Sequence, residues 1–436
     1  MGYDAFLSAG GFPARLHRAR LQLDCHDHMT QLDTTRHKLS PPCNRMQGSC
    51  VGNCFPLLDD LCLCGTHTQE DRLLAPGWWP RKGSETRERY LGSAACADCH
   101  ARIVDIQKTS PMISASMPAN GSVFGRSGIT SPLSFSTGTY KFEIALNAGG
   151  PAYSASDGTH SVSTSLGWAF GGGHFGQTYL YQQQGTFYES TLSYYPAIRG
   201  LDFTPGHTRS APRSLAQALG EPQTLDTIRA CFGCHTTAAT TSNRFDPDHA
   251  TPGVTCEACH GPGAQHVAAM SLANGNRSAS FTFNPASLSP SDSVEFCGAC
   301  HRTTLDAIET KIRGILTLRF PVYRLQASRC WGSDGDPRVT CVACHDPHRP
   351  LVTDTAAYDK NCLSCHRLVS TSTTPSQPVA DRASAAPAKD HSGTACPVAQ
   401  RDCVSCHMPK YNIPEMHADF TDHKIAIHQP GAPFKE

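Results

Sequence analysis

The chain has little of the apolar material with which a globular protein of its length usually folds. Only 39% of its 436 residues are hydrophobic, and no apolar run approaches the roughly twenty residues that a membrane helix needs. Its 37 basic residues balance 37 acidic ones, and the lack of a basic run argues against a nucleic-acid partner. A chain so poor in aliphatic side chains would struggle to bury a core of its own. We therefore expect another component to supply apolar volume.

Cysteine and histidine are abundant instead, with 22 residues of each. Most of the cysteines belong to seven copies of one pattern, Cys-x-x-Cys-His. The paired cysteines are Cys96 and Cys99, Cys231 and Cys234, Cys256 and Cys259, Cys297 and Cys300, Cys341 and Cys344, Cys362 and Cys365, and Cys403 and Cys406. The histidines that complete the motifs are His100, His235, His260, His301, His345, His366 and His407.

The repeated pattern is the attachment site of c-type haem. Two thiols at this spacing reach two vinyl groups on one porphyrin edge, and the adjacent histidine places its imidazole on the iron. Zinc is the main alternative, but zinc ribbons pair their knuckles into four-ligand sites and need no histidine in every copy. A disulfide within the motif would be strained and reducible. The sequence thus predicts seven covalently attached haem c groups, whose porphyrins form most of the core.

The predicted fold class is a mainly α and irregular multihaem cytochrome c fold, with short helices and loops packed on stacked haems and a β-rich insertion. Short helices are predicted at residues 214–219, 265–273 and 304–312. Residues 140–146 alternate between apolar and polar, as a half-buried strand does. Two β-rich runs, 177–181 and 186–195, flank Gln184 and Gly185, which predicts a hairpin.

We expect six segments along the chain. They are residues 1–86, an unassigned segment rich in cysteine and histidine; 87–129, the first haem segment; 130–204, the β-rich insertion; 205–369, the haem cluster with motifs two to six; 370–395, a flexible linker; and 396–436, the seventh haem segment. The first segment shows no secretory signal, and its six cysteines fit no zinc template. Because haem attachment takes place outside the cytoplasm, the simplest hypothesis is a misplaced start, with the true leader encoded upstream or in another frame.

Each haem iron needs a sixth ligand, for which ten further histidines are available in the motif-bearing region. They are His160, His174, His207, His249, His266, His348, His391, His417, His423 and His428. His266 follows His260 by six residues, which is too close to cross its own haem but suits a neighbouring one. His348 has the same geometry, stiffened by a proline. With His249 and His423, these two form the favoured set of sixth ligands.

Weaker candidates complete the predicted metal set, because isolated histidines are more often surface or hydrogen-bonded residues than ligands. His174 and His207 are second-rank candidates. The histidines expected to be bystanders are His160, His391 and His428. Met112, twelve residues after His100, is a candidate sixth ligand of the first haem, where a thioether would raise the reduction potential. The alternative for Met112 is a buried side chain that packs on the porphyrin.

Four segments resemble a family of multihaem c cytochromes. They are Tyr90-Leu-Gly-Ser-Ala-Ala-Cys-Ala-Asp-Cys-His100, Gly253-Val-Thr-Cys-Glu-Ala-Cys-His-Gly-Pro-Gly263, Cys341-Val-Ala-Cys-His-Asp-Pro-His348 and Cys403-Val-Ser-Cys-His-Met-Pro-Lys410. The best-known member of that family is the tetrahaem cytochrome (cytochrome c-554) that accepts electrons from hydroxylamine oxidoreductase. From about Arg87 onwards, the resemblance implies periplasmic electron transfer, stacked haem pairs and histidine ligands donated between haems. The seven motifs, the β-rich insertion and Met112 depart from the tetrahaem members.

Two functions follow from these observations. In the first, all haems are six-coordinate and carry out electron transfer; in the second, one haem keeps an open position and acts on a small nitrogen or sulfur compound. The chain has no Cys-x-x-Cys-Lys, which marks the catalytic haem of related pentahaem nitrite reductases, and its ten spare histidines favour full coordination. We therefore predict an exported, periplasmic electron-transfer protein with redox protein partners, such as a membrane-bound quinone-linked complex or another cytochrome. Nucleic acid and a transmembrane segment are not expected.

Two cysteines of the motif-bearing region, Cys330 and Cys396, lie outside the motifs. In an oxidising compartment a leftover pair of this kind usually forms a disulfide. Such a bridge is expected here, and it would tie the seventh haem segment to the segment of the fifth motif.

Overall fold

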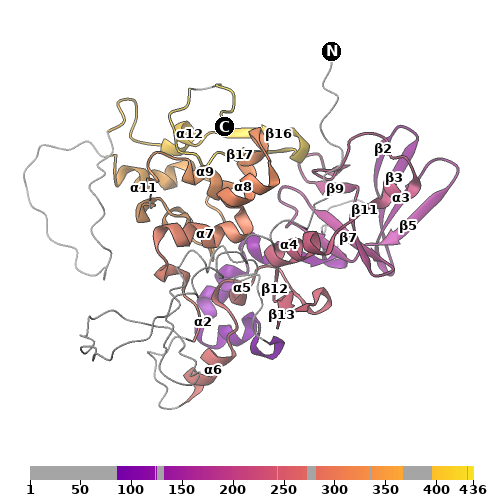
Figure 1. Cartoon of the computed structure of the whole chain (residues 1–436), viewed down its shortest axis with the longest axis horizontal. Helices are drawn as coiled ribbons and strands as arrows, with labels where there is room; N and C mark the ends of the chain where they lie inside the picture. Colours follow the sequence, from indigo (N-terminus) through magenta and orange to yellow (C-terminus); the bar gives the residue numbers. More distant parts are fainter. Residues whose placement is uncertain are drawn as a thin grey trace, which may run out of the picture. The chain divides into compact units, whose positions relative to one another are not determined.

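Short helices carry the Cys-x-x-Cys-His motifs (Figure 1). The helices that contain motif residues are α2 (Ser93–Gln107), α4 (Leu225–His235), α5 (Cys256–His260), α7 (Pro290–His301), α10 (Cys341–Cys344), α11 (Asp359–Leu363) and α12 (Cys403–His407). Residues three apart lie on the same face of a helix, so a helical turn brings the two cysteines of a motif together. In α4, α5, α7 and α12 the motif histidine is the last helical residue, which frees its imidazole to turn away from the helix.

The computed structural model describes residues 86–122, 124, 132–242, 244–272, 281–333, 335–366, 395–429 and 431–436. These residues belong to one of two units of the chain, the one that extends from His67 to Glu436. The predicted N-terminal segment 1–86 lies outside the described residues except for Thr86, and the predicted linker 370–395 does so except for Ala395. His391 also lies outside them. The predicted segment boundaries stay predictions.

The other described α-helices are short. They are α3 (Leu215–Leu219), α6 (Ala264–Ser271), α8 (Thr304–Thr310) and α9 (Pro321–Gln326). The first three confirm the predicted helices, with ends that differ by at most two residues. Two of them, α3 and α8, begin at polar caps. Ser214 caps α3 by accepting the N–H of Gln217, and Thr303 and Asp306 form a capping box at α8. Across the described ranges, no helix has both the length and the apolar character needed to cross a membrane.

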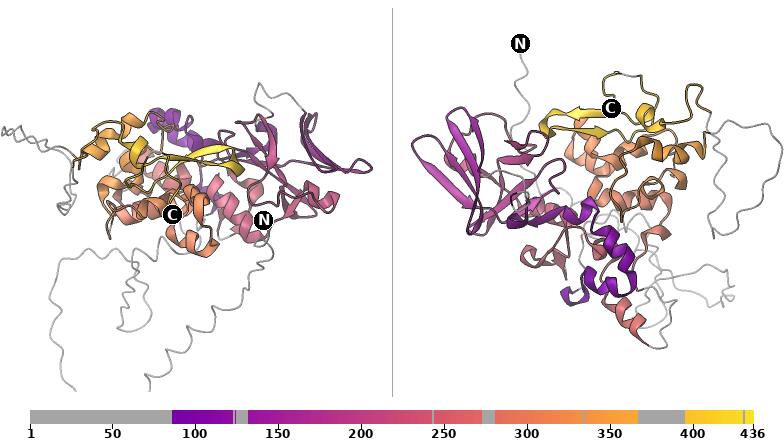
Figure 2. Two further views of the ribbon diagram at one scale, coloured as in Figure 1. Left: turned by 90° about the horizontal axis from the view of Figure 1, so that it is seen from above. Right: turned by 180° about the vertical axis from the view of Figure 1, so that it is seen from behind.

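Antiparallel sheets occupy the region between the first two motifs (Figure 2). A four-stranded sheet contains, in spatial order, β2 (Leu133–Thr137), β3 (Tyr140–Asn147), β4 (Gly150–Ser156) and β5 (Ser161–Ser165). A five-stranded sheet contains β1 (Ser116–Pro118), β6 (Trp168–Phe170), β7 (Thr178–Gln183), β8 (Thr186–Ser190) and β11 (Gly220–Pro222). A third pair is β9 (Leu192–Tyr195) with β10 (Gly200–Phe203). The predicted strand at 140–146 is therefore confirmed as β3.

The hairpin predicted at Gln184 and Gly185 joins β7 to β8. Both residues have positive φ, 50° and 80°, as a two-residue hairpin of type I′ requires, and Gln183 pairs with Thr186 across the turn. The β-rich run 186–195, however, forms two strands rather than one. Beyond Ser190 the chain leaves β7 and pairs with β10, and the N–H of Thr191 bonds the carbonyl of Leu219 at the break.

Small two-stranded pairs complete the strands of the described residues. They are β12 (Thr236–Thr237) with β15 (Thr251–Pro252), β13 (Thr240–Thr241) with β14 (Arg244–Phe245), and β16 (Lys410–Ile413) with β17 (Ala418–Thr421). The last pair, yellow in Figures 1 and 2, is the hairpin that leads the chain from the seventh motif to His423.

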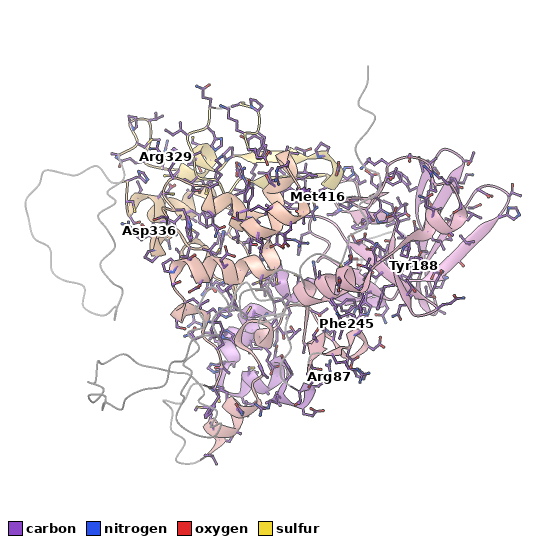
Figure 3. The ribbon with its side chains drawn as sticks, in the orientation of Figure 1. Arg87, Tyr188, Phe245, Arg329, Asp336 and Met416 are labelled. Atoms are coloured by element: carbon purple, nitrogen blue, oxygen red, sulfur yellow. The ribbon has the colours of Figure 1, made fainter. Side chains whose placement is uncertain are left out.

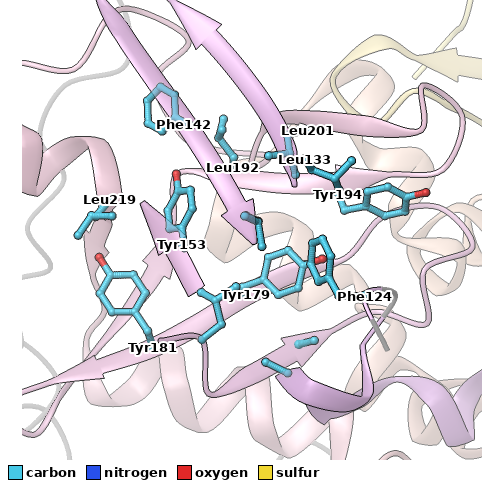
Figure 4. Packing of buried hydrophobic residues seen from close by; sticks show 14 of the residues in the cluster. Phe124, Leu133, Phe142, Tyr153, Tyr179, Tyr181, Leu192, Tyr194, Leu201 and Leu219 are labelled. Atoms are coloured by element: carbon cyan, nitrogen blue, oxygen red, sulfur yellow. The ribbon is translucent and has the colours of Figure 1, made fainter. Parts of the chain in front are cut away.

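The sheets have a core of their own side chains, which differs from our expectation that porphyrins form most of the core. Phe142, Ile144, Tyr153 and Tyr179 are almost fully buried there, together with residues of β1, β9, β10 and α3 (Figure 4). Alternation along β3 and β4 turns one set of side chains inward, and the core contains several phenylalanine and tyrosine rings. This region therefore has the apolar volume to pack without a cofactor, despite the low aliphatic content of the chain.

A smaller cluster attaches the second motif to the five-stranded sheet. Phe232, which lies between the two cysteines of that motif in α4, is fully buried, and it meets Trp168 and Phe170 edge to face at 5.1 and 5.2 Å. Phe187 and Phe245 close the other sides (Figure 3 labels Phe245). The helix of the second motif is thus fixed to the sheet by packing inside the motif itself.

A third cluster joins the fourth and fifth motifs to the C-terminal segment. Val294 of α7, Val322 and Leu325 of α9 and Trp331 are buried together. Ile425 packs against this cluster from the far end of the chain, and so do Cys297 and Cys341. Helix α9 therefore connects the haem motifs of α7 and α10 with the residues around His423.

Candidate haem sites

Several motif histidines have their side chains oriented by a backbone carbonyl. The Nδ1 atoms of His235, His260 and His407 lie 3.0, 2.9 and 2.8 Å from the carbonyl oxygens of Ala115, Phe283 and Ala426. A carbonyl can only accept, so each imidazole donates from Nδ1 and presents a lone pair at Nε2. Hydrogen bonding of one ring nitrogen while the other binds a metal is the usual arrangement of a histidine ligand. These side chains are therefore prepared to hold an iron through Nε2.

Three pairs of imidazoles face each other across nearly the same distance. The ring centroids are 6.5 Å apart for His100 and His266, 6.1 Å for His260 and His348, and 6.4 Å for His345 and His423. Two metal–nitrogen bonds of about 2 Å each, added to the ring radii, place the centroids of two axial imidazoles roughly 6 Å apart. The three pairs therefore fit the axial ligands of a haem iron, and they are too far apart for direct ring stacking.

The pairs follow a regular order along the chain. Each contains one motif histidine and one histidine that lies shortly after a different motif. His266 follows the third motif and faces the first, His348 follows the fifth and faces the third, and His423 follows the seventh and faces the fifth. We expected His266 and His348 to reach a neighbouring haem, and the structure places both beside the histidine of another motif.

Burial keeps several of these imidazoles neutral. It lowers the pKa of His423 to about 4, and the nearby His345 adds to the shift. Burial also lowers the pKa values of His235, His301 and His345. Because only a neutral imidazole has a lone pair for a metal, low pKa values suit axial ligation at any ordinary pH.

Attachment cysteines of different motifs are neighbours. In the haem-loaded protein these thiols would be thioethers, so their contacts mark which porphyrin edges lie together. Burial and the nearby Cys256 thiol raise the pKa of Cys96 to about 11. A hydrogen bond links Cys297 with Cys341, and another links Cys362 with Cys403. The first cysteines of motifs one and three, four and five, and six and seven are therefore in contact.

The second motif joins this arrangement through the fourth. Cys234 Sγ lies 3.6 Å from the carbonyl oxygen of Ala299, which stands between the cysteines of the fourth motif. Asn361, the residue before Cys362 of the sixth motif, donates to Cys344 Sγ of the fifth motif at 3.3 Å. All seven attachment segments are thus neighbours of at least one other.

One buried carboxylate holds the first and third motifs together. Glu257, inside the third motif and almost fully buried, accepts the N–H groups of Leu91 and Gly92 at 2.9 and 2.8 Å. It also accepts the N–H of Gly263 at 2.8 Å, at the start of the helix that carries His266. Glu257 was not predicted from the sequence. Its signal there is an acidic side chain between the two cysteines of a motif, where burial is expected.

Two further contacts bind the first segment to the third motif. Arg87, labelled in Figure 3, donates to the carbonyl oxygens of His249 and Ala238. Gly253 has a φ of 75° and lies so close to Ile113 that any side chain would overlap the Ile113 carbonyl. Only glycine fits at this position, which lies three residues before the third motif.

The remaining predicted ligands have other surroundings. His249 is largely exposed and donates from Nδ1 to the Asp246 carboxylate at 3.0 Å, which leaves Nε2 for a metal. His207 is buried and places Nε2 itself 3.0 Å from Glu189. His174 lies against Gly172.

Met112 is not the residue that faces His100 in the structure. It lies in a 3-10 turn, Pro111–Ser114, whose backbone bonds Val254, while the ring that faces His100 is that of His266.

His428, which was expected to be a bystander, has a buried imidazole nitrogen. Its Nε2 atom is buried and has no hydrogen-bond partner among the described residues, whereas Nδ1 lies 3.5 Å from the Tyr411 hydroxyl. His417, by contrast, uses Nε2 to bind Asp202 at 2.7 Å. The predicted disulfide is not formed: in the structure Cys330 and Cys396 are both free thiols.

Comparison with known proteins agrees with the motifs. Residues 206–261, which contain the second and third motifs, match the family "Cytochrome c554 and c-prime". The chain is similar to multihaem c-type cytochromes. This match confirms the resemblance predicted from the motifs, and resemblance to a c-type cytochrome implies covalently bound haem c and electron transfer. A solved structure, outer cell wall cytochrome OcwA, is 14% identical and aligns with a TM-score of 0.44 over 77% of this chain and 79% of that chain. No curated protein matches the chain.

Proposed function

We propose that the chain is an exported multihaem cytochrome that attaches seven haem c groups and passes electrons between redox protein partners. The observation that carries this proposal is the spacing of 6.1 to 6.5 Å between three pairs of imidazole rings. This spacing does not correspond to a zinc ribbon, in which four ligands surround one ion at tetrahedral angles. It corresponds to two axial ligands on opposite faces of a porphyrin iron.

Each haem would be held by the two thioethers and the histidine of its motif, and its iron would supply the one-electron chemistry. His266, His348 and His423 serve as sixth ligands of the first, third and fifth haems. We also propose His249 and His428 as ligands of further haems, because Nε2 of His249 is available and Nε2 of His428 is buried without a described partner. An iron with two imidazoles has no open position for a substrate, which favours electron transfer over catalysis.

The contacts between attachment segments support a continuous path for electrons. Electron transfer between haems weakens steeply with distance, so successive porphyrins must be neighbours. Cysteines join motif one to three, and motif three approaches motif four through Phe283, whose carbonyl accepts from His260 and whose ring packs on Phe296, the residue before Cys297. Cysteines join motif four to five and motif six to seven, Asn361 joins motif five to six, and Cys234 joins motif two to four. We propose that electrons cross the molecule in this order, with the second haem as a branch.

Location and organisation form part of the same proposal. Covalent haem attachment takes place outside the cytoplasm, so the protein is exported, to the periplasm or beyond. Its partners are redox proteins, such as a membrane-bound quinone-linked complex or another cytochrome. Segment 130–204 acts as a β-rich insertion within the haem protein.

The test is the intact mass and the ferric EPR spectrum of the protein purified from its natural host. We expect a mass that corresponds to seven haems and a spectrum of low-spin iron. A colourless protein, or zinc at the thiols, would contradict the proposal. A high-spin component that shifts when nitrite or cyanide is added would instead support an oxidoreductase with one open haem.

A further inference from the structure

We propose that Arg324 is a positioning residue that holds His423 opposite His345 through an ion pair with Asp422. The inference rests on the proposed function, because it assumes that a haem occupies the fifth motif. Arg324 lies outside all seven Cys-x-x-Cys-His motifs and far from His423 in the sequence.

The ion pair has the geometry of a rigid fork. Arg324 Nε donates to Asp422 Oδ1 at 2.9 Å, and Nη2 donates to Oδ2 at 2.7 Å. The side chains are 1% and 0% exposed. Two parallel hydrogen bonds fix both the distance and the plane of the carboxylate, which a single contact with a lysine could not do.

The last residues of the chain enclose the guanidinium. Nη2 also donates to the carbonyl oxygen of Lys435 at 3.0 Å, and the guanidinium lies 4.7 Å from the centre of the Phe434 ring. Placing two charges out of contact with water is costly, and such pairs often add little to stability compared with apolar residues. A buried pair at this position is therefore better explained by the exact placement of a neighbouring group than by stability.

That neighbouring group is His423, the residue after Asp422. The backbone on both sides of His423 is fixed by the same part of the molecule that carries Arg324. Ser328 donates to the carbonyl of His423 at 3.4 Å and accepts the N–H of Ile425 at 2.8 Å. The N–H of Asp422 bonds the carbonyl of Pro409 at 2.9 Å.

The ring of His423 has its own fixed orientation within this anchored segment. Nδ1 donates to the carbonyl of Thr421 at 3.1 Å, which directs Nε2 towards the site shared with His345. Helix α9 carries Arg324 and packs on α7. The position of His423 is therefore fixed relative to these two helices, which lie beside the fourth and fifth motifs. Arg324 thus binds the residue directly before the ligand, with no other residue of the chain between Asp422 and His423.

The test uses Arg324→Met in the full haem-loaded protein, with His423→Ala as the reference for a lost ligand. We expect Arg324→Met to retain seven haems by mass, while the ferric EPR signal of one haem changes from low-spin to high-spin. Added imidazole should restore the low-spin signal, because it replaces the misplaced side chain. A purely structural role would not produce a defect at one haem that free imidazole repairs.

Two further variants and a control make the outcome decisive. Arg324→Met combined with Asp422→Leu removes the unpaired buried charge, so it should fold and still show one high-spin haem. Arg324→Lys keeps the charge without the fork and should show a partial high-spin fraction. The matched control is Arg338→Met, which breaks the similar fork to Asp336 (2.6 Å for Nη2 to Oδ2) and should leave every haem low-spin.

Low-spin iron at all haems in the Arg324 variants would overturn this inference while leaving the proposed function intact. The proposed function fails on a different result, the absence of haem from the wild-type protein. If the single variant does not fold, the double variant and Arg324→Lys give the answer.

Discussion

At the scale of single residues, the hydrogen-bond partners of the imidazoles differ from site to site. His260 donates to a neutral carbonyl, whereas Nδ1 of its partner His348 lies 3.3 Å from the Asp346 carboxylate. Nδ1 of His345 lies 3.5 Å from the Tyr358 hydroxyl. A charged acceptor makes an imidazole ligand more basic and stabilises the oxidised iron. With haems bound as proposed, these partners would set different reduction potentials at otherwise similar sites.

Asp346→Asn should raise the reduction potential of the third haem, because the amide no longer increases the basicity of His348. We expect a rise on the order of tens of millivolts for one haem. Spectroelectrochemical titration measures it. Asp354→Asn is the control, since it removes the same charge from a side chain that, among the described residues, accepts the Ala356 N–H and contacts no histidine. An equal change in both variants would show that charge alone, and not the contact with His348, is responsible.

Glu257→Gln should destabilise the contact between the first and third motifs. The carboxylate accepts three backbone N–H groups, and an amide must present an N–H₂ group to one of these donors. An unsatisfied buried donor costs about 1–3 kcal/mol. The measurement is the thermal unfolding midpoint, with exposed Glu309→Gln as the control. Equal midpoints for wild type and Glu257→Gln would remove the organising role given to this residue.

At the scale of elements, helices α3, α6 and α8, strand β3 and the hairpin of β7 and β8 followed from local patterns, but their tertiary contacts did not. The caps at Ser214 and Thr303 and the alternation along β3 depend on residues close in sequence, so they could be recognised. The break of the run 186–195 into two strands depends on pairing with β10, which no local pattern reports.

The candidate haem sites also combine residues that the sequence singles out with contacts that it does not. The spacing to the cysteines singled out the motif histidines together with His266 and His348, which the structure places beside histidines of other motifs. Which motif each sixth ligand would face depended on the tertiary fold. Arg324 and Asp422 are 98 residues apart. From the sequence alone, charged side chains such as these are expected at the surface. The predicted disulfide between Cys330 and Cys396 rested on composition and compartment alone, and in the structure both cysteines are free thiols.

Phe232→Ala should detach the helix of the second motif from its sheet. Phe232 is fully buried and contacts four aromatic rings, and truncation of such a residue costs about 3–5 kcal/mol. Phe175, which is half exposed and stacks only on Phe420, is the matched control and should cost less than about 1 kcal/mol. Thermal unfolding followed by circular dichroism in the haem absorption band compares the two. Similar losses would show that the cluster does not anchor this motif.

At the scale of the whole described unit, one carboxylate connects the strands to the C-terminal segment. Asp202 of β10 binds Arg209 at 2.6 Å and His417 at 2.7 Å. Burial opposes its ionisation, but the hydrogen bonds from Arg209, the Phe203 amide and His417 outweigh burial and lower the pKa of Asp202. A group whose pKa is lowered on folding adds stability above its unfolded pKa of about 4 and loses it as the pH falls through the folded value.

Asp202→Asn should therefore reduce stability near neutral pH and have little effect in acid. The difference in thermal midpoint between wild type and variant should be largest around pH 7, and it should shrink steadily below about pH 4. Unfolding curves collected over this range measure the difference. A gap that stays constant down to pH 2 would mean that Asp202 acts through packing rather than through its charge.

The order of the imidazole pairs has a consequence for how the molecule matures. If haems are attached as the chain emerges from the membrane with its N-terminus first, the first site lacks its second imidazole until the third motif has emerged. The third site waits in the same way for the fifth, and the fifth waits for the seventh. Biogenesis would then pass through five-coordinate intermediates, and a truncated chain would leave its most recently loaded irons reactive towards small molecules that the complete protein excludes.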